Sequence, residues 1–252
     1  DPKLHTKKNL KIFFDNTNCR LLPIKVNLIN KLWNIKKDKD VKKFYILSKA
    51  IVGCTYKEKI DKLLNILKKK KVDFQFITAS ENIAWLLNIR GQDSDFTPLP
   101  NSYLSIENNG KINLFCDLKK IEASFRKKLG NINIIDIKKT SFLLSKIKNK
   151  KTLIDSSTCC VYFENIIKKN NKIVDFFDPI YFLKSIKSGV EIKNTIKTHI
   201  ADGAALTKFL FWVKRNYKIK NVDEISAQEK LLELRKENKN FRFSSFPTIS
   251  SS

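Results

Sequence analysis

The chain has 252 residues, a hydrophobic share of 42% and a formal net charge of +25 at pH 7. This length allows one to two ordinary domains, and the apolar stretches are too short and too interrupted for a membrane span. The charge alone would suggest that the chain binds nucleic acid. However, lysine far outnumbers arginine, and proteins that recognise bases and phosphates favour the forked guanidinium of arginine. We therefore expect no nucleic-acid partner and lysines scattered over all faces.

The first residues show no signal-peptide pattern, and the chain starts at Asp1 without any methionine. We expect it to be a piece of a longer protein. Residues 1–23, with a short helix at Lys8–Phe14, are interpreted as the tail of an earlier domain. The charged run Asn34–Asp40 is interpreted as a solvated linker.

A capping-box pattern at Thr55–Glu58 predicts a helix with apolar residues at helical spacing. The helix is expected to end in Lys68–Lys71, where cations suit the negative end of its dipole. The alternating segment Asp73–Thr78 then predicts a strand, and Ser80–Leu87 a second helix. Helix, strand and helix in this order indicate an α/β fold.

The turn sequence Asn108-Asn109-Gly110 predicts a hairpin between strands at 102–107 and 111–117, because its residues tolerate positive φ. Further strands are predicted at 132–137 and 152–155, with helices at about 121–129, 140–148 and 158–169. Short strands alternating with helices imply a mixed sheet covered by helices.

The longest predicted helix begins at a second capping box, Ser188–Glu191, and keeps its four-three apolar spacing for more than six turns. Another helix is predicted at about Ala227–Asn238. Residues Phe241–Ile249 are predicted to be extended.

Neighbouring residues supply no self-contained active site. The chain has two histidines, and its six glycines never cluster into a phosphate loop. His199 and Asp202 lie three residues apart on one face of a predicted helix. Two interpretations are open: the two side chains share a metal ion, or, more simply, they pack and hydrogen-bond locally. Five irregularly spaced cysteines argue against a disulfide framework or a zinc site and fit a reducing cytoplasm, and each is interpreted as a small buried apolar residue.

The loop from Asn88 to Pro100 is the most function-like stretch, because it carries Arg90, Asp93 and Asp95 just after Trp85. Arg90 and Asp93 are our candidates for residues that face a substrate. The alternative is a structural salt bridge from Arg90 to Asp93 or Asp95.

The stretch Glu81–Gly91, continued by Asp93, Pro98 and Ser102-Tyr103, resembles the middle domain of three-domain Xaa-Pro aminopeptidases. These belong to the creatinase and methionine-aminopeptidase-like superfamily. Further blocks agree in order along the chain: Asn27-Leu28-Ile29 with Trp33; Lys187-Ser188, Glu191-Ile192, His199-Ile200 and Asp202–Leu206; and Phe243–Ser252.

The resemblance implies an α/β fold with a creatinase-N-terminal-like, ribonuclease-H-like mixed sheet and flanking helices. It implies a first-domain remnant at 1–23, a middle domain at 24–178 and, at 179–252, the first helices of a pita-bread catalytic domain that are incompletely packed and expose apolar faces. The implied enzyme is a cytoplasmic homodimer that removes an N-terminal residue preceding proline, using two divalent metals, usually manganese. All metal ligands are expected downstream of Ser252, so no metal, catalytic residue or membrane contact is assigned to this chain.

Two other interpretations stay open at this point. One is a non-catalytic relative that serves as a binding or assembly module, and sequence beyond Ser252 separates it from the peptidase. The other is a basic nucleic-acid-associated protein, which requires lysines concentrated on one face rather than scattered over all of them.

Overall fold

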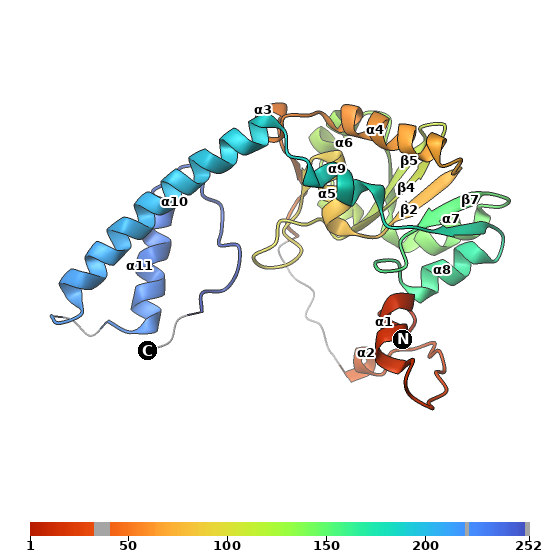
Figure 1. Ribbon diagram of the computed structural model, residues 1–252, viewed down its shortest axis with the longest axis horizontal. Helices are drawn as coiled ribbons and strands as arrows, with labels where there is room; N and C mark the ends of the chain where they lie inside the picture. The colour runs from red at the N-terminus through yellow and green to blue at the C-terminus, as the bar shows by residue number, and fades with distance from the viewer. Residues whose placement is uncertain (33–40, 220–221, 250–252) are drawn as a thin grey trace. The chain divides into compact units, whose positions relative to one another are not determined.

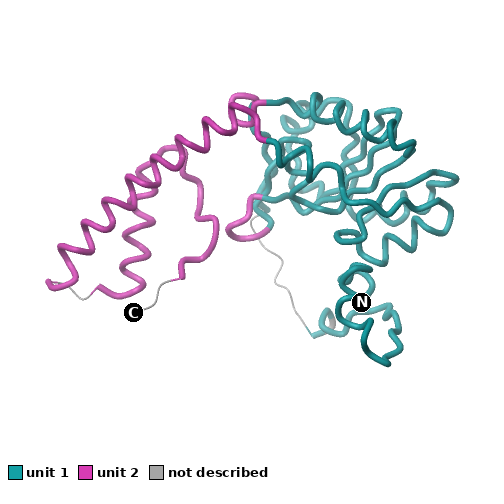
Figure 2. Tube along the Cα trace, viewed as in Figure 1, with its two compact units in different colours: residues 1–48, 54–93, 99–186 teal, residues 49–53, 94–98, 187–252 magenta. Residues whose placement is uncertain are grey.

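The computed structural model describes residues 1–32, 41–219 and 222–249 (Figure 1). The chain divides into two compact units (Figure 2). Unit 1 contains residues 1–48, 54–93 and 99–186, and unit 2 contains residues 49–53, 94–98 and 187–252.

Unit 1 holds all the strands and most of the helices found in the described residues. The strands are β1 (Tyr45–Ile46), β2 (Phe74–Ile77), β3 (Ile89–Arg90), β4 (Ser102–Glu107), β5 (Ile112–Cys116), β6 (Asn133–Asp136), β7 (Lys151–Ile154) and β8 (Lys172–Asp175). The helices are α1 (Lys7–Phe14), α2 (Ile29–Leu32), α4 (Tyr56–Lys69), α5 (Ser80–Leu87), α6 (Ala123–Leu129), α7 (Thr140–Lys146), α8 (Val161–Lys168) and α9 (Pro179–Ser185), with short 3-10 turns at Leu118–Lys120 and Ile137–Lys139.

A six-stranded mixed sheet forms the centre of unit 1, in the order β6-β5-β4-β2-β7-β8. Strand β4 is antiparallel to both of its neighbours, β2 and β5, whereas β5–β6, β2–β7 and β7–β8 pair in parallel. The β4–β5 hairpin turns at Asn108-Asn109-Gly110, where Gly110 has φ +90°, a conformation that glycine adopts readily. Strands β1 and β3 form a separate antiparallel pair.

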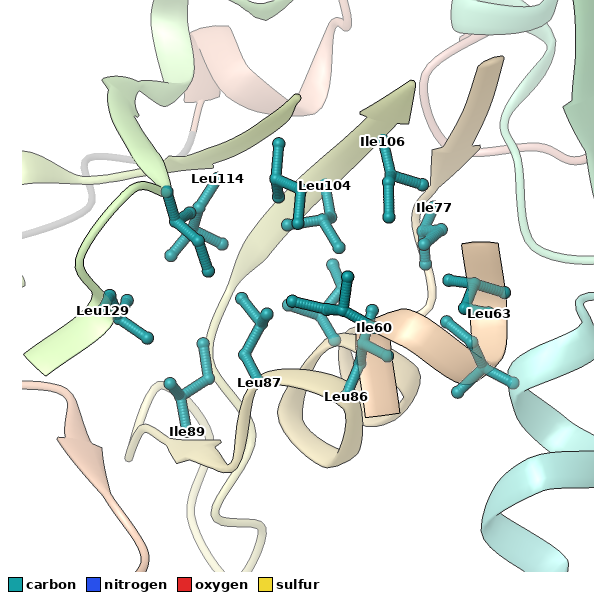
Figure 3. Packing of buried hydrophobic residues seen from close by; sticks show 14 of the residues in the cluster. Ile60, Leu63, Ile77, Leu86, Leu87, Ile89, Leu104, Ile106, Leu114 and Leu129 are labelled. Carbon is teal, nitrogen blue, oxygen red and sulfur yellow. The ribbon is translucent and has the colours of Figure 1, made fainter. Parts of the chain in front are cut away.

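Both faces of the sheet are buried, because side chains alternate along each strand and helices cover both sides. One face packs under α4, α5, α6 and α9 and includes Leu104, Ile106, Ile77 and Leu153. Figure 3 shows this core, with Leu86 and Leu87 of α5 and Ile60 and Leu63 of α4. On the other face, α7 and α8 cover a smaller cluster that contains Phe74, Phe76, Leu144, Ile154, Phe163 and Ile167.

Unit 2 consists chiefly of the helices α3 (Lys49–Val52), α10 (Gly189–Asn216) and α11 (Glu224–Lys236). Arg235 of α11 donates from Nε and Nη2 to the Asp202 carboxylate of α10, at 2.7 and 3.2 Å. The side chain of Asn194 donates to the carbonyls of Ala50 and Ile51. These polar contacts join the helices, whereas the apolar burial within the unit is small.

The C-terminal helices expose apolar side chains, as predicted. In the described part of residues 187–252 the buried hydrophobic side chains are Ala205 and Leu234 alone. The exposed ones include Ile192, Ile196, Ile200, Leu206, Leu210 and Phe211. Ile200 keeps 69% of its surface exposed, although it lies in a regular apolar stripe.

The predicted fold class is confirmed, because the chain forms a mixed sheet with flanking helices. Both capping boxes begin a helix, with Thr55 and Ser188 each accepting from the amide of the glutamate three residues later. Strand β8 and helix α9 were not predicted, and the run at 34–40 lies outside the described residues. The boundary between the units at 186/187 lies eight residues after the predicted domain boundary at 178/179, which itself stays a prediction.

Candidate functional site

Arg90 lies at the end of β3, where its guanidinium donates hydrogen bonds to backbone carbonyls. Its Nη1 donates to the carbonyl of Ala84 at 3.0 Å and to that of Ile89 at 2.8 Å. The first bond satisfies a carbonyl in the last turn of α5, where helical carbonyls lack partners within the helix. Arg90 therefore ties β3 to the end of the preceding helix.

Asp93 holds the two ends of the following loop together. One carboxylate oxygen pairs with the Lys120 ammonium, and the other accepts from the backbone N–H of Asn101 at 2.5 Å. Gly91 contributes to the same closure, since a Cβ there would lie 2.9 Å from the Leu99 carbonyl oxygen. Arg90 and Asp93 are three residues apart in the sequence, and each has hydrogen-bond or ion-pair partners inside unit 1.

A buried lysine contacts the end of helix α5. Lys59 is 2% exposed, and its ammonium donates to the Trp85 carbonyl at 2.9 Å and to Oδ1 of Asn88 at 2.6 Å. It also lies 4.1 Å from the centroid of the Trp85 ring, a cation–π contact strengthened by burial. Sequence reasoning missed Lys59, although its place one turn before Leu63 on the buried face of α4 was a usable signal.

A buried polar cluster surrounds Asp178, the N-cap of α9. Its carboxylate accepts from the side-chain amides of Gln75 at 2.9 Å and Asn82 at 2.7 Å, and from the Ile180 N–H at 3.0 Å. The Asp178 N–H in turn donates to the Asp155 carboxylate at 2.9 Å. Strand β2, helix α5 and helix α9 are thereby joined through one side chain.

Burial sets the ionisation of this cluster. It raises the pKa of Asp178, with nearby Asp155 acting in the same direction, while the hydrogen bonds from Ile180, Asn82 and Gln75 oppose the rise. The pKa of Lys184, which donates to Asn82 at 2.8 Å, is lowered by burial although Glu81 and Asp178 favour its charge. The amide donors of Gln75 and Asn82 and the Asp178 carboxylate are committed to one another, which is the arrangement of a structural clamp. Among the described residues, Oε1 of Gln75 is buried and accepts no hydrogen bond.

The other sequence candidates take structural roles. Asp202 is held by Arg235, and His199, one turn earlier, is exposed. Burial raises the pKa of Cys116 to about 12 and also raises that of Cys159, so both thiols stay protonated. The interpretation as buried apolar residues holds for these two cysteines but is wrong for Cys19, which is exposed.

Across the described ranges, no group of three or more histidine, cysteine, aspartate or glutamate side chains could hold a metal ion. The donors present among these residues do not fit a two-metal centre. The same ranges contain no helix both long and apolar enough to cross a bilayer.

Comparison with known families agrees with the fold and with the stretch around Trp85. The profile of the creatinase/prolidase N-terminal domain matches residues 36–191. Since this match covers more than half of the chain, the protein belongs to the creatinase/prolidase N-terminal domain family.

The similar curated proteins include Xaa-Pro aminopeptidases. The chain is 33% identical over its whole length to the Xaa-Pro aminopeptidase ApepP of Drosophila melanogaster, of which it covers 43%. It is 31% identical to Xaa-Pro aminopeptidase 1 of Dictyostelium discoideum, over 89% of the chain and 38% of the relative. The chain therefore spans about two fifths of the length of these curated relatives.

Solved structures give the same picture. An X-prolyl aminopeptidase from Caenorhabditis elegans, described as a cytosolic enzyme with a di-nuclear active site, superposes with a TM-score of 0.83 at 26% identity. The match covers 91% of this chain and 39% of that enzyme. A Bacillus anthracis Xaa-Pro dipeptidase matches at a TM-score of 0.52 and 17% identity, covering 73% of this chain and 49% of its own, which is a likeness of fold.

Proposed function

We propose that this chain forms the creatinase-like part of an Xaa-Pro aminopeptidase, which hydrolyses the bond between an N-terminal residue and a following proline. The observation that carries the proposal is the 33% identity to the fly aminopeptidase over the full length of the chain. The TM-score of 0.83 to the nematode X-prolyl aminopeptidase supports it.

The catalytic metals belong to another part of the enzyme in this proposal, because the described residues offer no suitable ligand cluster. The di-nuclear active site of the nematode enzyme supports two divalent ions, and we propose manganese. Two such ions supply activation of water and stabilisation of negative charge developing on the scissile carbonyl. The contribution of this chain is a compact α/β unit followed by the α10–α11 pair.

The proposal extends to the partners and location of the complete enzyme. Its substrate is a peptide with proline in second position, its assembly a homodimer, and its compartment the cytoplasm, supported by the cytosolic nematode relative. No membrane contact is included.

Arg90 and Asp93 stay predicted as substrate-facing residues. Their contacts with backbone carbonyls, Lys120 and Asn101 give each a structural role as well. In the complete enzyme, Asp93→Asn separates the two roles. A rise in KM supports substrate contact, whereas a lowered urea midpoint with unchanged KM shows that Asp93 only holds the ends of the loop together.

The decisive experiment begins by recovering the coding sequence on both sides of this chain. The complete protein is then assayed for release of the first residue from an Xaa-Pro-Xaa peptide, with manganese and after chelation, beside residues 1–252 alone. Metal-dependent release by the complete protein and none by the 252-residue chain is expected. A folded complete protein without release would instead favour a non-catalytic binding or assembly module.

A further inference from the structure

Lysines gather at one edge of the six-stranded sheet. Strands β2, β7 and β8 are mutually parallel, so their amino ends meet at the same edge, and each is preceded by a lysine-rich segment that ends a helix. We call this surface the lysine edge. Its eleven lysines are Lys68, Lys69, Lys70, Lys71, Lys146, Lys148, Lys150, Lys151, Lys168, Lys169 and Lys172.

Contacts between the three segments show that they lie side by side. The Lys151 ammonium donates to the Lys70 carbonyl at 3.3 Å, and the Lys172 N–H donates to the Lys150 carbonyl at 3.0 Å. Asn149 and Asn170 are joined by a backbone hydrogen bond of 2.8 Å. Three neighbouring strands span about 10 Å, and the lysines are grouped around the ends of these strands, those of α4 on one face of the sheet and those of α7 and α8 on the other.

Few negative charges offset the lysine edge. Within residues 68–73, 146–151 and 168–172 the one acidic residue is Asp73, which accepts from the Lys151 N–H at 2.9 Å. Glu107, which pairs with Phe74 at the same end of the sheet, forms a salt bridge with Lys111. The ends of α4, α7 and α8 contribute roughly half a negative charge each. Helix capping therefore explains a few of the lysines, and a large positive excess is left. Lysines occur over the whole chain, as predicted from the sequence, and 11 of the 44 are gathered at this edge.

Two exposed aromatic rings lie against lysines of the edge. The ring of Phe142 is 60% exposed with the Lys146 ammonium 5.1 Å from its centroid, and Phe176 is 43% exposed with Lys70 at 3.5 Å. Aromatic faces beside a positive strip are the features with which proteins hold single-stranded nucleic acid, since every base can stack on a ring.

We propose that the lysine edge binds single-stranded nucleic acid through its phosphates, without regard to sequence. The lysine edge contains no arginine, so the bidentate guanine contacts that specify bases are missing from it. Because its lysines come from both faces of the sheet, the lysine edge does not form one flat surface, which suits a flexible polyanion better than a flat bilayer. This binding is separate from the aminopeptidase activity proposed above, and its test involves no peptide hydrolysis.

The test measures fluorescence anisotropy of a labelled oligouridylate with the 252-residue chain over a series of salt concentrations. The edge variant combines Lys69→Gln, Lys148→Gln and Lys169→Gln, whose side chains are exposed. The matched control combines Lys119→Gln, Lys138→Gln and Lys139→Gln, which are also exposed and follow the opposite ends of β5 and β6. Urea midpoints check that both triple variants stay folded.

The edge variant is expected to bind at least about tenfold more weakly, and its log–log salt slope should fall by about 2, since each phosphate contact of a single strand contributes about 0.7. The control should lose much less, and Phe142→Ala should weaken binding about fivefold or more. Equal losses in both triple variants overturn the proposal, because they indicate diffuse charge. Binding to phosphatidylserine vesicles with none to the oligonucleotide overturns it as well.

Discussion

The sheet of unit 1 and the α10–α11 pair of unit 2 differ in how much of their apolar pattern is buried. In unit 1, Leu63, Leu67, Leu104 and Leu114 are 0% exposed. In unit 2, α10 repeats an apolar spacing of similar regularity, yet Ile200 keeps 69% of its surface in solvent. An amphipathic pattern thus forms a helix in both places, whereas burial depends on a second layer that only the sheet provides.

The largest expected effect is a core truncation in the sheet. Leu104→Ala in β4 should cost about 2–5 kcal/mol, the usual range for removing a fully buried leucine side chain. Ile200→Ala in α10 should change stability by less than about 0.5 kcal/mol, as exposed substitutions do. Urea unfolding curves of the two variants measure the difference, and similar losses would show that α10 is buried in solution.

The next effect concerns two helix caps in different surroundings. Asp178→Ala should cost about 2 kcal/mol or more, because it removes the cap of α9 and leaves the buried amides of Gln75 and Asn82 without an acceptor. Asp223→Ala removes the exposed cap of α11 and should lower the unfolding midpoint less. An equal or larger loss at Asp223 would contradict the clamp assigned to Asp178.

A smaller difference in stability is expected between ion pairs of the two units. Asp93→Asn weakens a shielded pair with Lys120 and should cost about 2 kcal/mol. Asp202→Asn weakens the more exposed pair with Arg235 and should cost less than about 1 kcal/mol. Double-mutant cycles with Lys120→Gln and Arg235→Gln isolate each coupling. Comparable coupling energies in both cycles would remove the distinction between the units.

The smallest effect is in the dependence of stability on pH. The folded chain raises the pKa of Asp178 above 3.8, so it binds that proton more tightly than the unfolded chain does. The stabilisation of wild type relative to Asp178→Asn should therefore be greatest below pH 3.8 and shrink as pH rises through the folded pKa.

Asp223 should show the opposite sign. Hydrogen bonds from Ser226 lower its pKa below 3.8, so its stabilisation is present above that value and is lost as pH falls through the folded pKa. Urea unfolding of Asp178→Asn, Asp223→Asn and wild type over an acidic pH series measures both trends. Parallel trends for the two variants would refute the assigned directions.

Some elements were missed because their local signals are short. Strand β8 lies at one end of the strand order and has no buried residue, and its adjacent Ile173 and Val174 do not alternate with polar residues, so it lacks the pattern that predicts a strand. An aspartate N-cap followed by proline at the first helical position is a recognised start signal, and α9 begins there. The resemblance around Trp85 identified the family but not the buried Lys59 beneath it.

By itself, the sequence determined what depends on near neighbours: the helices that follow Thr55 and Ser188, the hairpin at Gly110, and the motif blocks that identify the family. Capping hydrogen bonds and turn conformations involve residues only a few positions apart, so their patterns can be read directly. Tertiary structure alone decided that Asp178 joins Gln75 to Asn82 and that three distant lysine segments meet at one sheet edge. Those neighbours are set by strand order, which brings together residues up to about a hundred positions apart.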